Sequence, residues 1–220
     1  MVELIAACVA FVGAHFLLSH PLRSPVVSRL GERGFLGLYS LVAFATLGWM
    51  VAAYLKLPEQ AALWPVGDAL WAVGTAIMWL GSVLFVGSLF GNPAMPEANT
   101  AAVPTPLGVF AITRHPMMWG FALWALTHIL VYPEPAQILL AGTIGFLALV
   151  GAHLQDRKKA ALQPNFWPEW ERRTSYIPFA RGLANPGAVA LLGGTALWLV
   201  ASWAHLPIAG WDAGVWRWIV

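Results

Sequence analysis

Residues 112–128 read ITRHPMMWGFALWALTH, a short basic corner followed by about three turns of apolar sequence. Pro116 stands where a helix would begin, and proline suits the first helical position because its missing N–H is not needed there. At 3.6 residues per turn, one stripe of this helix collects Met117, Phe121, Trp124 and His128. Its aromatic side chains either wall a flat ligand such as a polyene or serve ordinary packing. An imidazole buried on such a helix needs a hydrogen-bond partner or a metal.

The composition is that of a membrane protein. Of the 220 residues, 59% are hydrophobic and 10% are charged, whereas about 25% of a typical soluble domain is charged. The net charge of +2, without a long basic run, argues against nucleic acid as a partner. The single cysteine, Cys8, excludes an internal disulfide and any cysteine-ligated zinc or iron–sulfur site. The expected partners are the lipid bilayer and a small apolar substrate.

Six apolar segments are long enough to span a bilayer, which takes roughly 20 apolar residues, with about 17 as the lower end. We predict an all-α, polytopic transmembrane helical bundle of about six spans, forming a single integral membrane domain over residues 1–220. In residues 156–181 aromatic side chains stand between charges, so we expect a cytoplasmic amphipathic segment in the plane of the interface. The predicted spans are residues 2–20, 35–56, 68–90, 116–132, 136–153 and 186–206.

The basic residues predict the orientation of the bundle. Ten of the twelve lysines and arginines lie in the links after the first, third and fifth spans, and Lys56 and Arg217 lie on the other side. Because links rich in lysine and arginine stay in the cytoplasm, we expect both termini to face the periplasm of a bacterial inner membrane. The ten are Arg23, Arg29, Arg33, Arg114, Arg157, Lys158, Lys159, Arg172, Arg173 and Arg181.

Histidines are the candidate ligands, because no carboxylate lies at mid-depth in any predicted span. His15 and His128 lie within spans, where an ionisable side chain is a functional candidate by default. Two neutral imidazoles on facing helices are what a haem iron needs for axial ligation; the alternative is that each is hydrogen-bonded to a neighbouring helix. The rise of a helix places His15 near the cytoplasmic side and His128 some 18 Å along its own segment, so His115 or His153 is an alternative partner for His15. We interpret the histidines His20 and His205 as interfacial polar residues.

Arg114 and His115 form a cytoplasmic corner with Asp156 and Arg157. We interpret this corner as mainly structural, or as a site for an anionic headgroup or a haem propionate. A guanidinium makes a bidentate, charge-assisted contact with a carboxylate that a neutral side chain cannot replace. If a haem lies between the first and fourth spans, Arg114 is therefore the cation best placed to meet a propionate.

Four short motifs lie along residues 10–180: GAH at 13–15, ITRHP at 112–116 followed by WALTH at 124–128, DR at 156–157, and RRTSYIPF at 172–179. In this combination they resemble the NnrU family, which includes bacterial proteins associated with denitrification and the plant zeta-carotene isomerase. The resemblance implies a haem b site with His15 and His128 as axial ligands of the iron. The plant isomerase has a cysteine three residues before the second histidine, proposed as a redox-switched ligand, and this chain has Ala125 there.

The resemblance implies, first, an enzyme that isomerises an apolar polyene between cis and trans forms with the help of haem. The second hypothesis is a non-catalytic haem- or nitrogen-oxide-handling protein that supports denitrification. A more distant similarity to membrane methyltransferases of the isoprenylcysteine type places S-adenosylmethionine at the Arg114–His115 corner, although Gln155 and Asp156 stand where those enzymes have paired glutamates. The candidate cofactor-binding residues are His15, His128, Arg114, His115 and Trp124.

Overall fold

The computed structural model describes residues 1–95 and 102–220. Within these ranges the chain forms helices and no β-strand. The longer helices are α1 (Val2–Ser19), α2 (Arg23–Leu55), α3 (Asp68–Gly87), α5 (Pro116–Val131), α6 (Pro135–Leu162) and α8 (Ala188–Ala209). The shorter ones are α4 (Val109–Ile112), α7 (Trp167–Arg173) and the 3₁₀ helix η1 (Gly214–Trp218).

Five helices in the described ranges, α1, α2, α3, α6 and α8, are long and apolar enough to cross a membrane. The fourth predicted span corresponds to α5, which is apolar but has only 16 residues. At about 1.5 Å per residue it is roughly 24 Å long, shorter than a hydrocarbon core of about 30 Å. The all-α, polytopic bundle predicted from the sequence is therefore confirmed, with α5 as its short member.

Three helices extend beyond the predicted spans: α8 by three residues, to Ala209, and α2 and α6 by more. Helix α2 begins at Arg23 and contains a break at Gly31, whose φ of 70° and ψ of 172° are not helical. Helix α6 continues past residue 153 to Leu162. The apolar sequence ends before the charged residues Arg157, Lys158 and Lys159. Because arginine and lysine are good helix formers, the helix continues through them.

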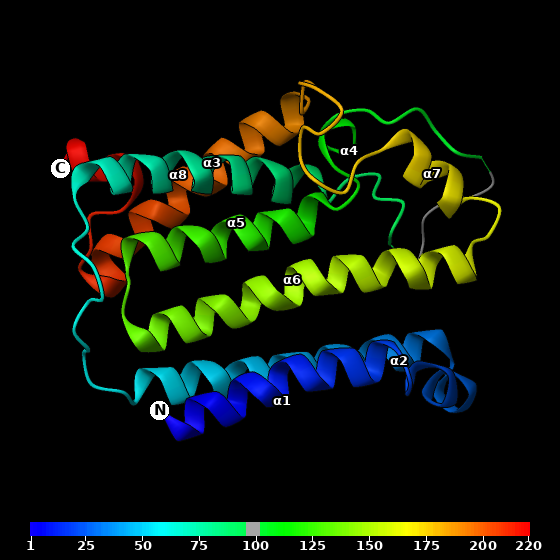
Figure 1. Ribbon diagram of the computed structural model, residues 1–220, viewed down its shortest axis with the longest axis horizontal. Coiled ribbons are helices and arrows are strands. Elements are labelled where there is room, and N and C mark those ends of the chain that lie inside the picture. The colour runs from blue at the N-terminus through cyan, green and yellow to red at the C-terminus, as the bar shows by residue number, and fades with distance from the viewer. Residues whose placement is uncertain (96–101) are drawn as a thin grey trace.

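The long helices form two groups that meet at α5 and α6 (Figure 1). Helices α1 and α2 pack on each other and, more sparsely, on α6, whereas α5 and α8 both pack on α3. The N- and C-termini lie at the same end of the bundle, together with the turn between α5 and α6, and we call this the termini end (Figure 1). The opposite end carries α4 and α7, and we call it the loop end (Figure 1).

Glycines let α5 and α8 approach α3 closely. A Cβ at Gly120 of α5 would lie 3.0 Å from the carbonyl oxygen of Gly81 of α3. A Cβ at Gly194 of α8 would lie 2.5 Å from the Cα of Val83 of α3. Small residues of this kind allow backbone-to-backbone packing of membrane helices. Both α5 and α8 are thereby held against the same helix.

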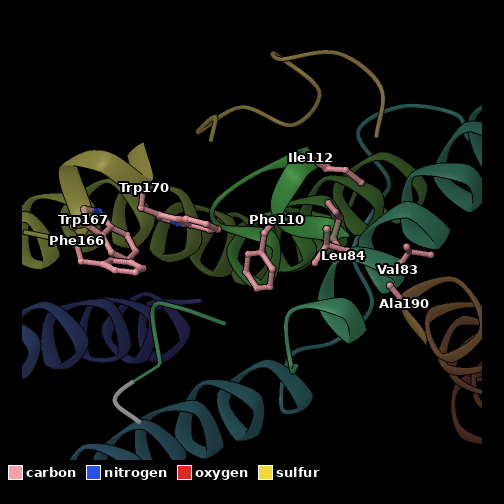
Figure 2. Packing of buried hydrophobic residues seen from close by; sticks show 9 residues of the cluster. Val83, Leu84, Phe110, Ile112, Phe166, Trp167, Trp170 and Ala190 are labelled. Atoms are coloured by element: carbon pink, nitrogen blue, oxygen red, sulfur yellow. The ribbon is translucent and has the colours of Figure 1, made fainter. Parts of the chain in front are cut away.

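An aromatic cluster caps the loop end (Figure 2). Trp167 and Trp170 of α7 are 0% and 1% exposed, and they belong to one core cluster with Phe110 of α4 and Leu84 of α3. The apolar side of the amphipathic segment thus packs on the bundle, while Arg172 at the end of α7 is exposed. This packing ties residues 166–173 to the start of α5.

Candidate functional site

A cavity of about 300 Å³ lies at the termini end, and we call it the termini-end cavity. It is lined mainly by residues of α3, α5, α8 and the segment after α8, with Tyr54 of α2 and Gln137 of α6. Two histidines, His128 of α5 and His205 of α8, line it together with several aromatic side chains. The aromatic members are Tyr54, Trp71, Trp124, Tyr132, Trp198 and Trp211.

The two histidines of this cavity are held in the same way. The Nδ1 atom of His128 lies 2.8 Å from the carbonyl oxygen of Trp124, and that of His205 lies 2.8 Å from the carbonyl oxygen of Ala201. A carbonyl oxygen only accepts, so Nδ1–H donates in both rings, and in the neutral imidazole Nε2 keeps its lone pair. The two ring centroids are 6.3 Å apart, with 37° between the ring planes.

A second cavity of about 510 Å³ lies nearer the loop end, and we call it the loop-end cavity. His15 of α1 lines it, and its Nδ1 atom donates to the carbonyl oxygen of Phe11 at 2.7 Å. The Ser19 hydroxyl donates to the carbonyl oxygen of His15 at 2.6 Å, so Nδ1 of His20 is the donor in its 2.8 Å contact with Ser19 Oγ. The Nε2 atom of His20 is then a buried acceptor with no partner among the described residues.

The structure does not bring His15 and His128 together. Helices α1 and α5 run in opposite directions, and the loop-end cavity that His15 lines also contains Met118, from the first turn of α5 (Figure 1). His128 is ten residues further along α5, about 15 Å at the helical rise. His15 and His128 therefore line different cavities in this arrangement. The indole of Trp124 lines both cavities and stands between them.

The loop-end corner is a buried hydrogen-bonded network centred on Asp156. Arg114 donates to Oδ2 from Nε and Nη2 at 2.9 and 2.7 Å, and His115 Nε2 lies 2.8 Å from Oδ1. The Trp167 indole donates to the same Oδ1 at 3.1 Å. The exposed fractions of the side chains are 13% for Arg114, 9% for Asp156 and 1% for His115. The network connects the start of α5, the end of α6 and the start of α7, and Asp156 compensates the charge of Arg114.

Tyr176 completes this corner. Its carbonyl oxygen accepts from the Trp119 indole at 2.8 Å and from the Thr113 hydroxyl at 2.7 Å. Its ring lies against the Arg114 guanidinium, 5.6 Å from the centroid. Burial, together with the negative charge of Asp156, raises the pKa of the Tyr176 hydroxyl above its ordinary value. The hydroxyl therefore stays protonated and donates to the carbonyl oxygen of Leu149 at 2.6 Å.

Reasoning from the sequence missed the role of His205 as a cavity residue, and a signal for it was present. His128 is three residues before the end of α5, and His205 is four residues before the end of α8. Both helices run toward the termini end (Figure 1), so equal distances from their ends place the two rings at similar depth. Trp211 follows α8 and also lines this cavity.

Fold and cavities together define a polytopic helical membrane protein with apolar, aromatic-walled cavities that contain histidines. The chain belongs to the NnrU family, because the family model described as "NnrU protein" matches residues 3–213.

Two curated relatives are 15-cis-zeta-carotene isomerases of the chloroplast. The protein of Zea mays is 30% identical over 112 residues, which cover 47% of this chain and 30% of that protein. The protein of Arabidopsis thaliana is 36% identical over 75 residues, covering 33% of this chain and 20% of that protein. The matched stretches thus span less than a third of either relative. No solved structure matches the chain.

Proposed function

We propose that this protein is a haem b-dependent isomerase of an apolar polyene, embedded in a bacterial inner membrane. The observation that carries the proposal is the pair of aromatic-walled cavities, each containing a histidine, that meet at Trp124. Family membership and the relatives named as 15-cis-zeta-carotene isomerases support the same class of reaction.

The donor set suits haem better than a bare metal ion. Among the described residues no group of three or more histidine, cysteine, aspartate or glutamate side chains could hold a metal ion. Structural zinc sites take four protein ligands and catalytic ones three, whereas a haem iron brings its own porphyrin nitrogens and takes one or two axial ligands. His15 and His128 each offer an Nε2 lone pair, fixed by a hydrogen bond at Nδ1.

The cavity that does not hold the haem is available for an apolar substrate. No aspartate or glutamate is among the described residues that line either cavity, so neither offers a carboxylate for general acid–base chemistry. Rotation about a double bond requires no net transfer of a proton or group. The bound haem would supply the electronic contact with the double bond, while aromatic walls such as Phe121 and Trp124 orient a flat chain and exclude water.

We also propose that the termini end faces the periplasm. The ten basic residues of the predicted links lie toward the loop end, six of them in the parts of α2 and α6 that extend beyond the predicted spans, and Lys56 and Arg217 belong to the termini end. This asymmetry is the one by which membrane proteins orient themselves during insertion.

The test is a purified full-length protein loaded with haem and given a 15-cis polyene in detergent micelles. We expect chromatography to show that the 15-cis isomer is converted to the isomer that is trans at position 15. Boiled protein should leave the isomer ratio unchanged. Haem loading with no change in the isomer ratio, in either redox state of the iron, would refute the isomerase proposal.

A further inference from the structure

We propose that the loop-end cavity binds an anionic phospholipid, with the phosphate among Arg23, Lys158 and Lys159 and one acyl chain inside the cavity. This inference goes beyond the proposed function, because it concerns a ligand other than the haem and the polyene. It follows from the way the cavity changes from apolar to polar and from the charges at its polar end.

The loop-end cavity changes from apolar to polar along its length. Helices α1 and α6 both run toward the loop end (Figure 1), and the last cavity residues on each are polar. On α1 these are Ser19 and His20. On α6 the cavity wall is one stripe at helical spacing, and from Ile144 to Lys158 it extends about 21 Å at the helical rise. The stripe consists of Ile144, Leu147, Ala148, Gly151, Gln155 and Lys158.

Three cations gather at the polar end of this cavity. Lys158 lines it, and Lys159 is only 9% exposed, with its ammonium 5.9 Å from the centroid of the Trp167 ring. Arg23 of α2 lies close enough to both lysines for the like charges to repel one another. Among the described residues no carboxylate forms an ion pair with either lysine.

The carboxylates near these cations do not balance them. Asp156, three residues before Lys159, is already engaged by Arg114 and His115. Glu32 pairs with Arg23, but its side chain is 59% exposed, and exposed pairs are weak. A buried ammonium without a counter-charge loses hydration that nothing replaces. The polar end of the cavity therefore favours an anion.

An anionic phospholipid has the chemistry that this site lacks. Its phosphate accepts charge-assisted hydrogen bonds from lysine and arginine, and its acyl chain suits the apolar part of a cavity of about 510 Å³. Basic pockets between helices on the cytoplasmic side commonly bind anionic headgroups, and the loop end is the side that we propose to be cytoplasmic. The buried Nε2 of His20, an acceptor without a partner among the described residues, suits a headgroup hydroxyl.

The experiment asks which lipids stay bound to the full-length protein after extraction from vesicles of equal parts phosphatidylglycerol and phosphatidylcholine, by native mass spectrometry. The matched control for Lys158→Gln and Lys159→Gln is Arg157→Gln, which removes the same charge from an exposed neighbour. We expect the wild type and Arg157→Gln to favour phosphatidylglycerol by at least about 10-fold. Each lysine variant should lower this preference about fivefold, the effect of about 1 kcal/mol per basic residue near an anionic surface.

Gly151→Leu tests the place of the acyl chain. A Cβ at Gly151 meets nothing within 4 Å, so a leucine side chain would enter the open space of the cavity without touching the charges. This variant should lose bound phosphatidylglycerol and still bind glycerol 3-phosphate. Retention of the lipid equal to that of the wild type would overturn the proposal that the chain lies in the cavity.

The remaining outcomes separate the lipid from other anions. Equal retention of the two lipids by the wild type overturns the inference, as does an unchanged preference in Lys158→Gln. If Lys158→Gln loses its helical circular dichroism, Lys158→Arg takes its place and should keep the preference; a lost preference in a folded Lys158→Arg protein also overturns the inference. Complete displacement by glycerol 3-phosphate would assign the site to soluble phosphates. Displacement by haem would assign the cations to its propionates, which overturns the lipid and leaves the proposed function standing.

Discussion

Replacing Asp156 with asparagine tests what holds the loop end together. Asp156 accepts four hydrogen bonds, two from Arg114 and one each from His115 and Trp167. Removing one partner of a buried ion pair leaves the other charge uncompensated, which costs about 3–5 kcal/mol. Arg114 keeps some contact with solvent, at 13% exposure, and asparagine keeps one acceptor oxygen. We therefore expect the free energy of unfolding to fall by about 3 kcal/mol, the lower end of that range.

The assay is equilibrium unfolding in mixed micelles with increasing fractions of a denaturing detergent, followed by tryptophan fluorescence. The matched control is Asp68→Asn, which removes the same charge from an ion pair with Arg217 whose carboxylate is 75% exposed. Exposed pairs contribute about 0–1 kcal/mol, so the control should differ little from the wild type. If the free energy of unfolding falls equally in both variants, and by less than about 1 kcal/mol, the reasoning is refuted. Unchanged stability together with lost S-adenosylmethionine binding in Asp156→Asn would instead favour the methyltransferase hypothesis.

Two further predictions follow from the orientation and the helix packing. Alkaline phosphatase fused after Val220 should be active in a bacterial host; a fusion active only with a cytoplasmic reporter would reverse the proposed orientation. Gly194→Ala should lower the free energy of unfolding by about 1–3 kcal/mol, because the added Cβ would meet the Val83 backbone. Gly142→Ala, where a Cβ meets nothing within 4 Å, is its control and should be neutral or slightly stabilising.

Much of the architecture could be predicted from the sequence, because it depends on local properties. In a bilayer every backbone polar group must be satisfied within its own segment, so an apolar run of sufficient length is a helix. The predicted starts of the fourth and fifth spans differ from those of α5 and α6 by at most one residue, and each helix has a proline at its first position. The start of α2 and the end of α6 were not predicted, because hydropathy marks where a segment stops being apolar and not where it stops being helical.

The sequence alone also determined which side chains are candidates: the histidines within spans, the aromatic stripe that includes Trp124, and the basic corner at Arg114. Only the tertiary structure decided which of them meet. Helical periodicity says which residues share a face, but not which helix covers that face. The close contact of Gly194 with Val83 holds α8 against α3 beside α5, which puts His205 near His128. Antiparallel α1 leaves His15 at the other end, since helix direction and rise set the depth of each side chain.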